Sequence, residues 1–386
     1  MRIAQIAPLY ESVPPSLYGG TERVVASLAD ALVDLGHDVT LFASGDSRTS
    51  ARLVATRERA LRLDPEGACD LPAHLVMFED VLARADAFDV LHFHTDCIQM
   101  PMFRHLAGRT VTTLHGRLDL VDLAPFYECF PEFPLVSISN HQRGPLARAN
   151  FVGTVHHGLP AENLPFTAAP VGDYVAFLGR ISPEKRPDRA IEIAKRAGVK
   201  LEIAAKVDKA DAAYFRERIE PLLDHPLVEF IGEIGDADKP AFLGNAKALL
   251  FPIDWPEPFG LVMIEAMACG TPVVAFDCGS VPEVVDDGIT GYIVRDLDEA
   301  VAAVGRLDDL DRPTIRRVFE ARFSAEAMAR AYVRIYERLV AERARSVIRV
   351  PRGGGLERHL ATFDAPPEPI VAADALAQPR RTRRPA

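Results

Sequence analysis

Paired cysteines and long hydrophobic runs are both missing from this sequence. Its five cysteines form no C-x-x-C pair, and their odd number argues against a disulfide framework and against a zinc ribbon. No stretch reaches the roughly 18 apolar residues of a membrane-spanning helix, and the N-terminal MRIAQIAP shows no signal-peptide pattern. We therefore expect a cytoplasmic protein without a transmembrane segment, and peripheral contact with a membrane stays open.

Common nucleotide-binding motifs are also missing. No G-x-G-x-x-G follows the first predicted strand and no Walker A lysine motif occurs, which argues against dinucleotide-binding and P-loop proteins. The formal net charge of −11 argues against a protein that binds nucleic acid through its phosphates.

The pattern of short apolar runs predicts the fold class. Runs rich in β-branched residues alternate with helical patterns, which indicates an α/β protein with parallel sheets. Six runs in each half of the 386 residues predict two doubly wound, Rossmann-like domains facing across a cleft. The predicted strands are RIAQIAP, DVTLFAS, DVLHFHT, TVTTLHG, LVSISN and FVGTVHHG, then YVAFLGR, KLEIAAK, VEFIGEI, ALLFPI, PVVAFD and GYIV.

Proline and small residues mark the boundary between the two predicted domains. They interrupt any periodicity over residues 156–173, which we interpret as a linker. The first domain is then expected over residues 1–165 and the second over residues 166–324. The arginine-rich segment 48–63 is interpreted as a solvated helix face, with contact to an acidic or lipid acceptor as the alternative.

The C-terminal part of the chain is predicted to be helical and then disordered. Apolar residues at helical spacing predict a long helix over about residues 325–345, with Ser324 as its N-cap, which we expect to cross back to the first domain. Proline, glycine and arginine dominate residues 350–386, which predicts a disordered tail.

The stretch FPIDWPEPFGLVMIEAMACGTP, residues 251–272, combines a strand end, a stiff loop and a helix. Pro256 and Pro258 restrict the backbone around Glu257, and Pro258 is predicted to open a helix that stops at Gly270. On such a helix Glu265 would lie roughly 10 Å from Glu257 along the axis. The free N–H groups of the first turn would lie between them, as a site for an anion. This layout suits a nucleotide-sugar. A lone pair of glutamates at this spacing is more often incidental, but the prolines, the glycine and the phenylalanine around this pair favour the functional interpretation.

Two further loops follow the first strand of each predicted domain. Gly19 and Gly20 precede a helix with Thr21 as its expected N-cap, and paired glycines allow close approach of a phosphate or a sugar. In the second domain, Arg180 and Lys185 follow a strand and can converge on one polyanion. A tight turn and a charged surface turn are the respective alternatives, at even odds.

Histidines are concentrated in the first half of the chain. His92 and His94 share one face of a strand and would permit a metal site with Asp96, but no third ligand has convincing spacing, so we expect no metal. His115 follows an apolar strand and precedes a glycine, which places it at the carboxyl end of that strand. Ser139, His141 and Arg143 end the next strand and are candidates for the acceptor side.

Taken in order, these motifs resemble a known family. G-G-T-E, T-L-H-G, H-H-G-L, G-R-x4-K, E-P-F-G-L-V-M-I-E and GSVPEVVDDGITGYIV are similar to segments of the retaining glycosyltransferases of family 4, which have the GT-B fold. The resemblance covers about residues 1–340, and YGGTERVV and FASGDS are similar to the branch that acts in avilamycin-type antibiotic synthesis. One departure is HHGLP, where many members have N-G-[VI]-D.

The resemblance implies a role for each candidate residue. The first domain would bind the acceptor and the second the nucleotide-sugar donor. Catalytic roles would fall to His115, Arg180, Lys185 and Glu257, with the two cations gripping the diphosphate. Glu265 would bind the ribose. The other implied donor contacts are Gly19, Gly20, Ile231 or its neighbours in VEFIGEI, Phe259, Gly260 and Leu261.

The resemblance also implies the reaction. A sugar would pass with retention from a donor such as a UDP- or GDP-sugar to a sugar, lipid or small-molecule hydroxyl, with no cofactor. No D-x-D motif lies in a matching loop, so the cations would replace the divalent metal of other glycosyltransferases. A nucleotide-sugar 2-epimerase, a sugar phosphorylase and a non-catalytic nucleotide-sugar sensor remain as alternatives. A glycoside hydrolase would have no use for Arg180 and Lys185.

Overall fold

The computed structural model describes residues 1–16, 19–64 and 69–348. The tail predicted over residues 350–386, and Leu17 and Tyr18 before the paired glycines, lie outside these described residues. No helix within the described ranges is both long enough and apolar enough to cross a membrane.

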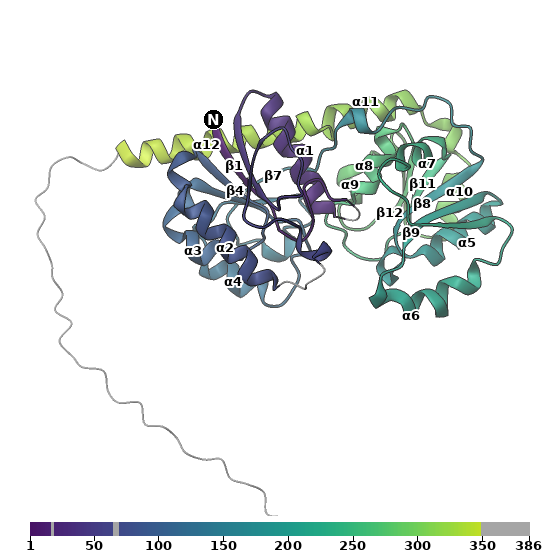
Figure 1. Cartoon of the computed structure of the whole chain (residues 1–386). Helices are drawn as coiled ribbons and strands as arrows, with labels where there is room; N and C mark the ends of the chain where they lie inside the picture. Colours follow the sequence, from purple (N-terminus) through teal and green to yellow (C-terminus); the bar gives the residue numbers. More distant parts are fainter. Residues whose placement is uncertain (17–18, 65–68, 349–386) are drawn as a thin grey trace, which may run out of the picture. The chain divides into compact units, whose positions relative to one another are not determined.

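Two parallel β-sheets form the framework, as the alternating pattern predicted (Figure 1). The first has seven strands in the order β3-β2-β1-β4-β5-β6-β7 and the second has six in the order β10-β9-β8-β11-β12-β13. The strands of the first sheet are β1 (Arg2–Ile6), β2 (Asp38–Ala43), β3 (Arg52–Ala55), β4 (Val90–Phe93), β5 (Thr110–Thr113), β6 (Leu135–Ser137) and β7 (Phe151–Thr154). Those of the second are β8 (Tyr174–Arg180), β9 (Lys200–Lys206), β10 (Val228–Gly232), β11 (Ala248–Phe251), β12 (Val273–Phe276) and β13 (Gly291–Val294).

Helices connect successive strands and bury the sheets. They are α1 (Gly20–Asp34), α2 (Asp70–Ala83), α3 (Met100–Phe103), α4 (Leu123–Cys129), α5 (Pro187–Ala197), α6 (Ala212–Tyr214), α7 (Lys239–Asn245), α8 (Leu261–Ala268), α9 (Val281–Val284), α10 (Leu297–Val304), α11 (Arg312–Arg322) and α12 (Ala325–Ile348). In each sheet the strand order reverses beside the first strand, between β1 and β4 and between β8 and β11. Ligands of doubly wound folds bind at the carboxyl ends of strands near such a reversal.

The last helix, α12, packs on the first sheet (Figure 1). Ser324 caps it as predicted, because its hydroxyl accepts a hydrogen bond from the Ala327 N–H at 3.2 Å. Further along, the Tyr336 hydroxyl lies 2.7 Å from His92 Nδ1 and accepts from Gln5 Nε2 at 3.2 Å. The residues between Thr154 and Tyr174 join the two sheets, and among them Leu159 forms a bridge with Ser324 at the start of α12.

Three local predictions are wrong. The arginine-rich segment contains an edge strand, β3, rather than a helix face, because Arg52–Ala55 pairs with β2 and edge strands tolerate exposed charges. Helix α1 begins at Gly20 with Gly19, not Thr21, in the N-cap position. Helix α8 begins at Leu261 rather than Pro258, since Gly260 just before it has φ +81°, outside the right-handed helical region.

The contacts of α12 lead to a prediction about stability. We expect Tyr336→Phe to lower the free energy of unfolding by about 1–3 kcal/mol, because it leaves two buried polar groups without a partner. The matched control is Tyr292→Phe, whose hydroxyl makes a single hydrogen bond, to the Arg306 carbonyl at 3.1 Å, so this change leaves one polar group without its partner rather than two. Urea denaturation measures both, and an equal loss in the two variants would contradict the expectation.

Candidate active site

A cavity of about 630 Å³ opens at the carboxyl ends of both sheets. Its walls come from the loop after β1, the end of β8, and the loop between β11 and α8. Its volume is typical of sites that hold a small molecule. The structure brings together in its walls most of the residues singled out from the sequence: Gly19, Gly20, His115, Arg180, Lys185, Glu257, Phe259, Gly260, Leu261 and Glu265.

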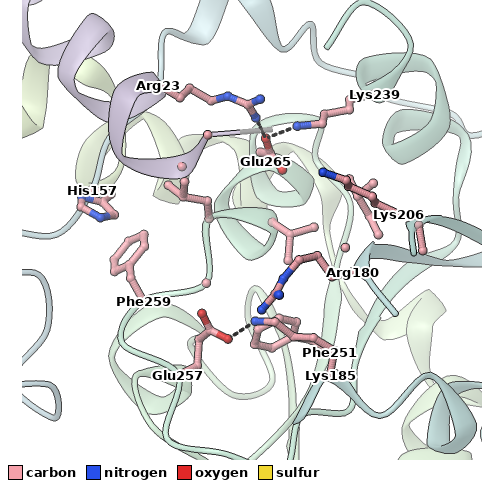
Figure 2. A pocket seen from close by; sticks show the side chains of 18 of the residues that line it. Arg23, His157, Arg180, Lys185, Lys206, Lys239, Phe251, Glu257, Phe259 and Glu265 are labelled. Atoms are coloured by element: carbon pink, nitrogen blue, oxygen red, sulfur yellow. Dashed lines mark hydrogen bonds and ion pairs between the residues drawn. The ribbon is translucent and has the colours of Figure 1, made fainter. Parts of the chain in front are cut away.

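Positive charge gathers at one part of this cavity (Figure 2). Arg180 ends β8, and its register partner Lys206 ends the adjacent β9, so the two side chains reach the cavity from neighbouring strands. Lys185 follows in the next loop. Sequence reasoning missed Lys206, although the rule that ligands bind at strand ends could have found it. Three cations around one space suit a group with several negative charges, such as a diphosphate.

Glu257 lies in the loop between β11 and α8, as predicted, and forms an ion pair with Lys185 (Figure 2). The Trp255 indole N–H donates to the same carboxylate oxygen at 2.9 Å. The Lys185 ammonium in turn lies 5.2 Å from the centre of the Trp255 ring. Because both side chains are largely buried, these contacts hold the carboxylate in one place at the cavity wall.

The loop around Phe259 and Gly260 brings the start of α8 to the cavity. The Ser280 hydroxyl donates to the Phe259 carbonyl at 2.8 Å, and the Ser280 N–H donates to the Glu257 carbonyl at 3.0 Å. A Cβ atom on Gly260 would lie only 3.0 Å from the Phe251 ring, so the site requires glycine for space as well as for backbone conformation. Leu261 at the N-terminus of α8 lines the cavity, where the helix dipole favours an anion.

Glu265 is the centre of a buried ionic cluster. Its Oε1 accepts from Arg23 on α1 at 2.8 Å and lies 3.2 Å from the Lys239 ammonium (Figure 2). Asp236 contacts the same two cations, at 2.7 and 2.9 Å. The Glu265 side chain is 7% exposed, so this carboxylate joins the first half of the chain to the second through largely desolvated charges. Neither Arg23 nor Lys239 was identified from the sequence.

The two histidines of the HFH segment are engaged with protein groups. His92 Nδ1 lies 2.7 Å from the Tyr336 hydroxyl, and its Nε2 lies 2.7 Å from Thr113 Oγ1. His94 Nε2 lies 2.8 Å from Gln5 Oε1. Across residues 1–16, 19–64 and 69–348, no group of three His, Cys, Asp or Glu side chains is arranged to hold a metal ion.

His115 connects this polar chain to the cavity. Its Nε2 lies 2.8 Å from His94 Nδ1, and its ring stacks on the ring of His157, with centroids 5.2 Å apart. Burial lowers the pKa of His115 to about 3 and that of His157 well below its ordinary value. Both rings are therefore neutral at physiological pH.

Comparisons with known proteins agree with this geometry. The family model "Glycosyltransferase Family 4" matches residues 18–149, and the model "Glycosyl transferases group 1" matches residues 168–311. The chain belongs to glycosyltransferase family 4.

Individual relatives support the assignment. Phosphatidyl-myo-inositol mannosyltransferase of Mycobacterium leprae is 27% identical over 374 aligned residues, covering 87% of this glycosyltransferase and 96% of the relative. The crystal structure of AviGT4, involved in avilamycin A biosynthesis, has a TM-score of 0.67 and 26% identity, covering 88% and 98% of the two chains. It confirms the resemblance to the avilamycin-type branch. Anabaena Alr3699/HepE in complex with UDP and glucose, at 17% identity and TM-score 0.67, shares the fold.

A second cavity, of about 290 Å³, adjoins the first in this glycosyltransferase. The two share wall residues at the paired glycines and around His115. The second cavity is lined by the buried carboxyl group of Glu22 and the exposed carboxyl group of Asp96, together with Tyr10 and Arg62. Burial raises the pKa of Glu22 to about 7.

Four residues singled out from the sequence, Ser139, His141, Arg143 and Ile231, lie outside the walls of both cavities. Ser139 and Arg143 line neither cavity, because the loop that carries them packs against α9: Glu283 accepts from the N–H groups of Asn140 and His141, each at 2.7 Å. The acceptor-side role of Ser139, His141 and Arg143 stays a prediction, without a cavity wall to support it. Ile231 on β10 is 40% exposed, and its neighbour Ile234 lines the larger cavity instead.

The pKa of Glu22 gives a testable pH dependence. Because this pKa is about 7 in the folded protein, above its ordinary value of 4.5, the folded state holds the proton more tightly than the unfolded state. Stability should therefore fall as pH rises from about 4.5 to about 7 and then level off. Glu22→Gln removes this loss, so at pH 8 it should exceed the wild type by on the order of 3 kcal/mol and match it near pH 4.

Denaturant titrations at several pH values measure this difference. The matched control is Glu326→Gln on α12, whose side chain is 63% exposed and should leave the pH curve unchanged. Parallel stability curves for Glu22→Gln and the wild type would contradict the expectation.

Proposed function

We propose that this glycosyltransferase moves a sugar from a nucleoside-diphosphate sugar to an acceptor hydroxyl, with retention of anomeric configuration and without a metal ion. The observation that carries the proposal is the division of charge along the larger cavity. Arg180, Lys185 and Lys206 gather at one part of it, whereas the neutral His115 and His157 lie at another. A diphosphate joined to an uncharged sugar has the same division.

The cations have a direct chemical use in this reaction. Cleavage of the anomeric C–O bond leaves negative charge on the departing diphosphate, and charges fixed in the wall stabilise it without reorganisation. Arg180 and Lys185, together with the N-terminus of α8, supply this stabilisation and take the place that a divalent metal has in other glycosyltransferases. In a retaining transfer the acceptor attacks from the face of the leaving group, and the departing phosphate oxygen takes its proton.

Glu257 acts in this proposal by position and charge. Its carboxylate is fixed by Lys185 and Trp255, so it can orient the sugar and stabilise positive charge at the anomeric carbon. Glu265 keeps its expected role as the ribose contact, and its ties to Arg23 and Lys239 hold the carboxylate ready for it. Ile234 is the apolar residue that we assign to the base.

We assign the acceptor to the second cavity. It adjoins the larger cavity beside His115, so an acceptor hydroxyl there lies next to the sugar. The carboxyl groups of Glu22 and Asp96 and the hydroxyl of Tyr10 are suited to hydrogen bonds with hydroxyl groups. A nucleotide-sugar substrate and five unpaired cysteines both fit the reducing cytoplasm, which remains the expected compartment.

Nucleotide binding tests the proposal through thermal stability. One of UDP, GDP and ADP, at about 100 times its dissociation constant and without metal, should stabilise the protein by about 2.7 kcal/mol, whereas NAD should not. Arg180→Ala should remove most of this shift, because it deletes a charged contact to the diphosphate. The matched control, Arg196→Ala, lies outside the cavity in an exposed ion pair with Asp298 and should keep the shift.

A second variant separates binding from catalysis in the same experiment. Glu257→Gln frees Lys185 from its ion pair, so it should keep the full nucleotide shift while losing turnover of the sugar donor. The proposal fails if no nucleoside diphosphate stabilises the wild type, or if Arg180→Ala keeps the whole shift.

A further inference from the structure

Two buried ring nitrogens in the wall of the larger cavity have no hydrogen-bond partner among the described residues. They are Nδ1 of His115 and Nδ1 of His157. The two rings are nearly parallel, at 17°, with centroids 5.2 Å apart. A buried polar atom without a partner costs free energy, so such a pair beside a cavity points to a ligand that completes it.

The hydrogen-bond chain behind His115 fixes which atom carries its proton. Gln5 Nε2 donates to the Tyr336 hydroxyl, so the Gln5 carbonyl faces His94 and accepts from His94 Nε2–H. Burial keeps these rings neutral, and a neutral imidazole has one donor and one acceptor. His94 Nδ1 must then accept from His115 Nε2–H. His115 Nδ1 is left as a bare acceptor on a side chain that lines the cavity.

His157 is held in place by the start of α12. The two residues after His157 contact this part of the chain. The Leu159 N–H donates to the Phe323 carbonyl at 2.9 Å. The backbone of Gly158 lies so close to Ser324 that a Cβ atom on Gly158 would be 2.3 Å from the Ser324 carbonyl oxygen. The His157 side chain is 4% exposed, and its ring packs edge-on against Phe259 with centroids 4.9 Å apart (Figure 2). The ring therefore has a fixed place beside the Glu257 loop.

We propose that His157 is a donor-sugar contact which, paired with His115, hydrogen-bonds hydroxyl groups of a neutral hexose. This inference rests on the proposed function and adds to it a residue and a class of sugar. Hydroxyl groups suit both nitrogens, because a hydroxyl donates to the bare acceptor of His115 and either donates to or accepts from His157. His157 also stands in H-H-G-L-P, where many family members carry N-G-[VI]-D.

The surroundings of the pair disfavour a hexuronate. Both imidazoles are neutral and His115 has no proton to offer, so a sugar carboxylate would gain no cation from them. The Glu257 carboxylate in the neighbouring loop would repel it. A neutral hexose meets none of these penalties.

Calorimetry that compares a nucleotide with its sugar conjugate isolates this contact. UDP, GDP and ADP are titrated first, followed by UDP-glucose, GDP-mannose or ADP-glucose for the base that binds. His157→Phe keeps the ring packing but removes the nitrogen, so it should weaken binding of the nucleotide-hexose about tenfold and leave the bare nucleotide unchanged. His157→Asn restores a hydrogen-bonding side chain and should stay within about threefold of the wild type.

The matched control is His156→Phe, the same change one residue away. His156 contacts Glu283 at 3.3 Å and does not line the cavity, so the variant should bind both ligands as the wild type does. The hexuronate conjugate of the same nucleotide should bind wild type more weakly than the hexose conjugate.

Three results overturn the inference. If His157→Phe changes the binding of neither ligand, or weakens the binding of both equally, His157 is not a sugar contact, and the nucleotide site is unaffected by that result. Equal binding of the hexuronate and hexose conjugates would refute the proposed preference for a neutral hexose. If wild type binds none of the three nucleotides, the proposed function itself is wrong, and this inference falls with it.

Discussion

The ion pair between Lys185 and Glu257 shows the constraint on which the whole site depends: charges taken out of water must be paired. The same constraint governs Glu265, whose carboxylate lies between Arg23 and Lys239. Each pair keeps a cation and a carboxylate in the cavity wall at a fixed position. A diphosphate that enters the cavity therefore meets cations whose positions are already set.

The hydrogen-bonded histidines supply neutral hydrogen-bonding groups at another part of the cavity. Burial keeps His94, His115 and His157 neutral, so they offer hydrogen bonds without attracting the diphosphate. The chain continues through Gln5 to Tyr336 on α12. Helix α12 thus helps to position the His115 ring at the cavity, through hydrogen bonds that pass from Tyr336 to Gln5 and His94.

The sequence predicted best what depends on neighbouring residues. All twelve predicted strands are present because apolar runs between turn residues are local signals, whereas the edge strand β3 has exposed arginines and resembled a solvated helix. Motifs placed Arg180 and Glu257 at the cavity. The contact of Arg23 with Glu265 joins residues 242 positions apart, and no local pattern encodes it. Ser139 lines neither cavity because its loop packs on α9, which no local pattern encodes.

The most direct test of the account is a crystal structure with a nucleoside-diphosphate hexose bound. The account predicts the diphosphate within hydrogen-bond distance of both Arg180 and Lys185, with the sugar hydroxyls against His115 and His157. A diphosphate bound away from these cations, or a sugar turned toward Lys206 instead of the histidines, would contradict the division of the cavity into a charged part and a neutral part.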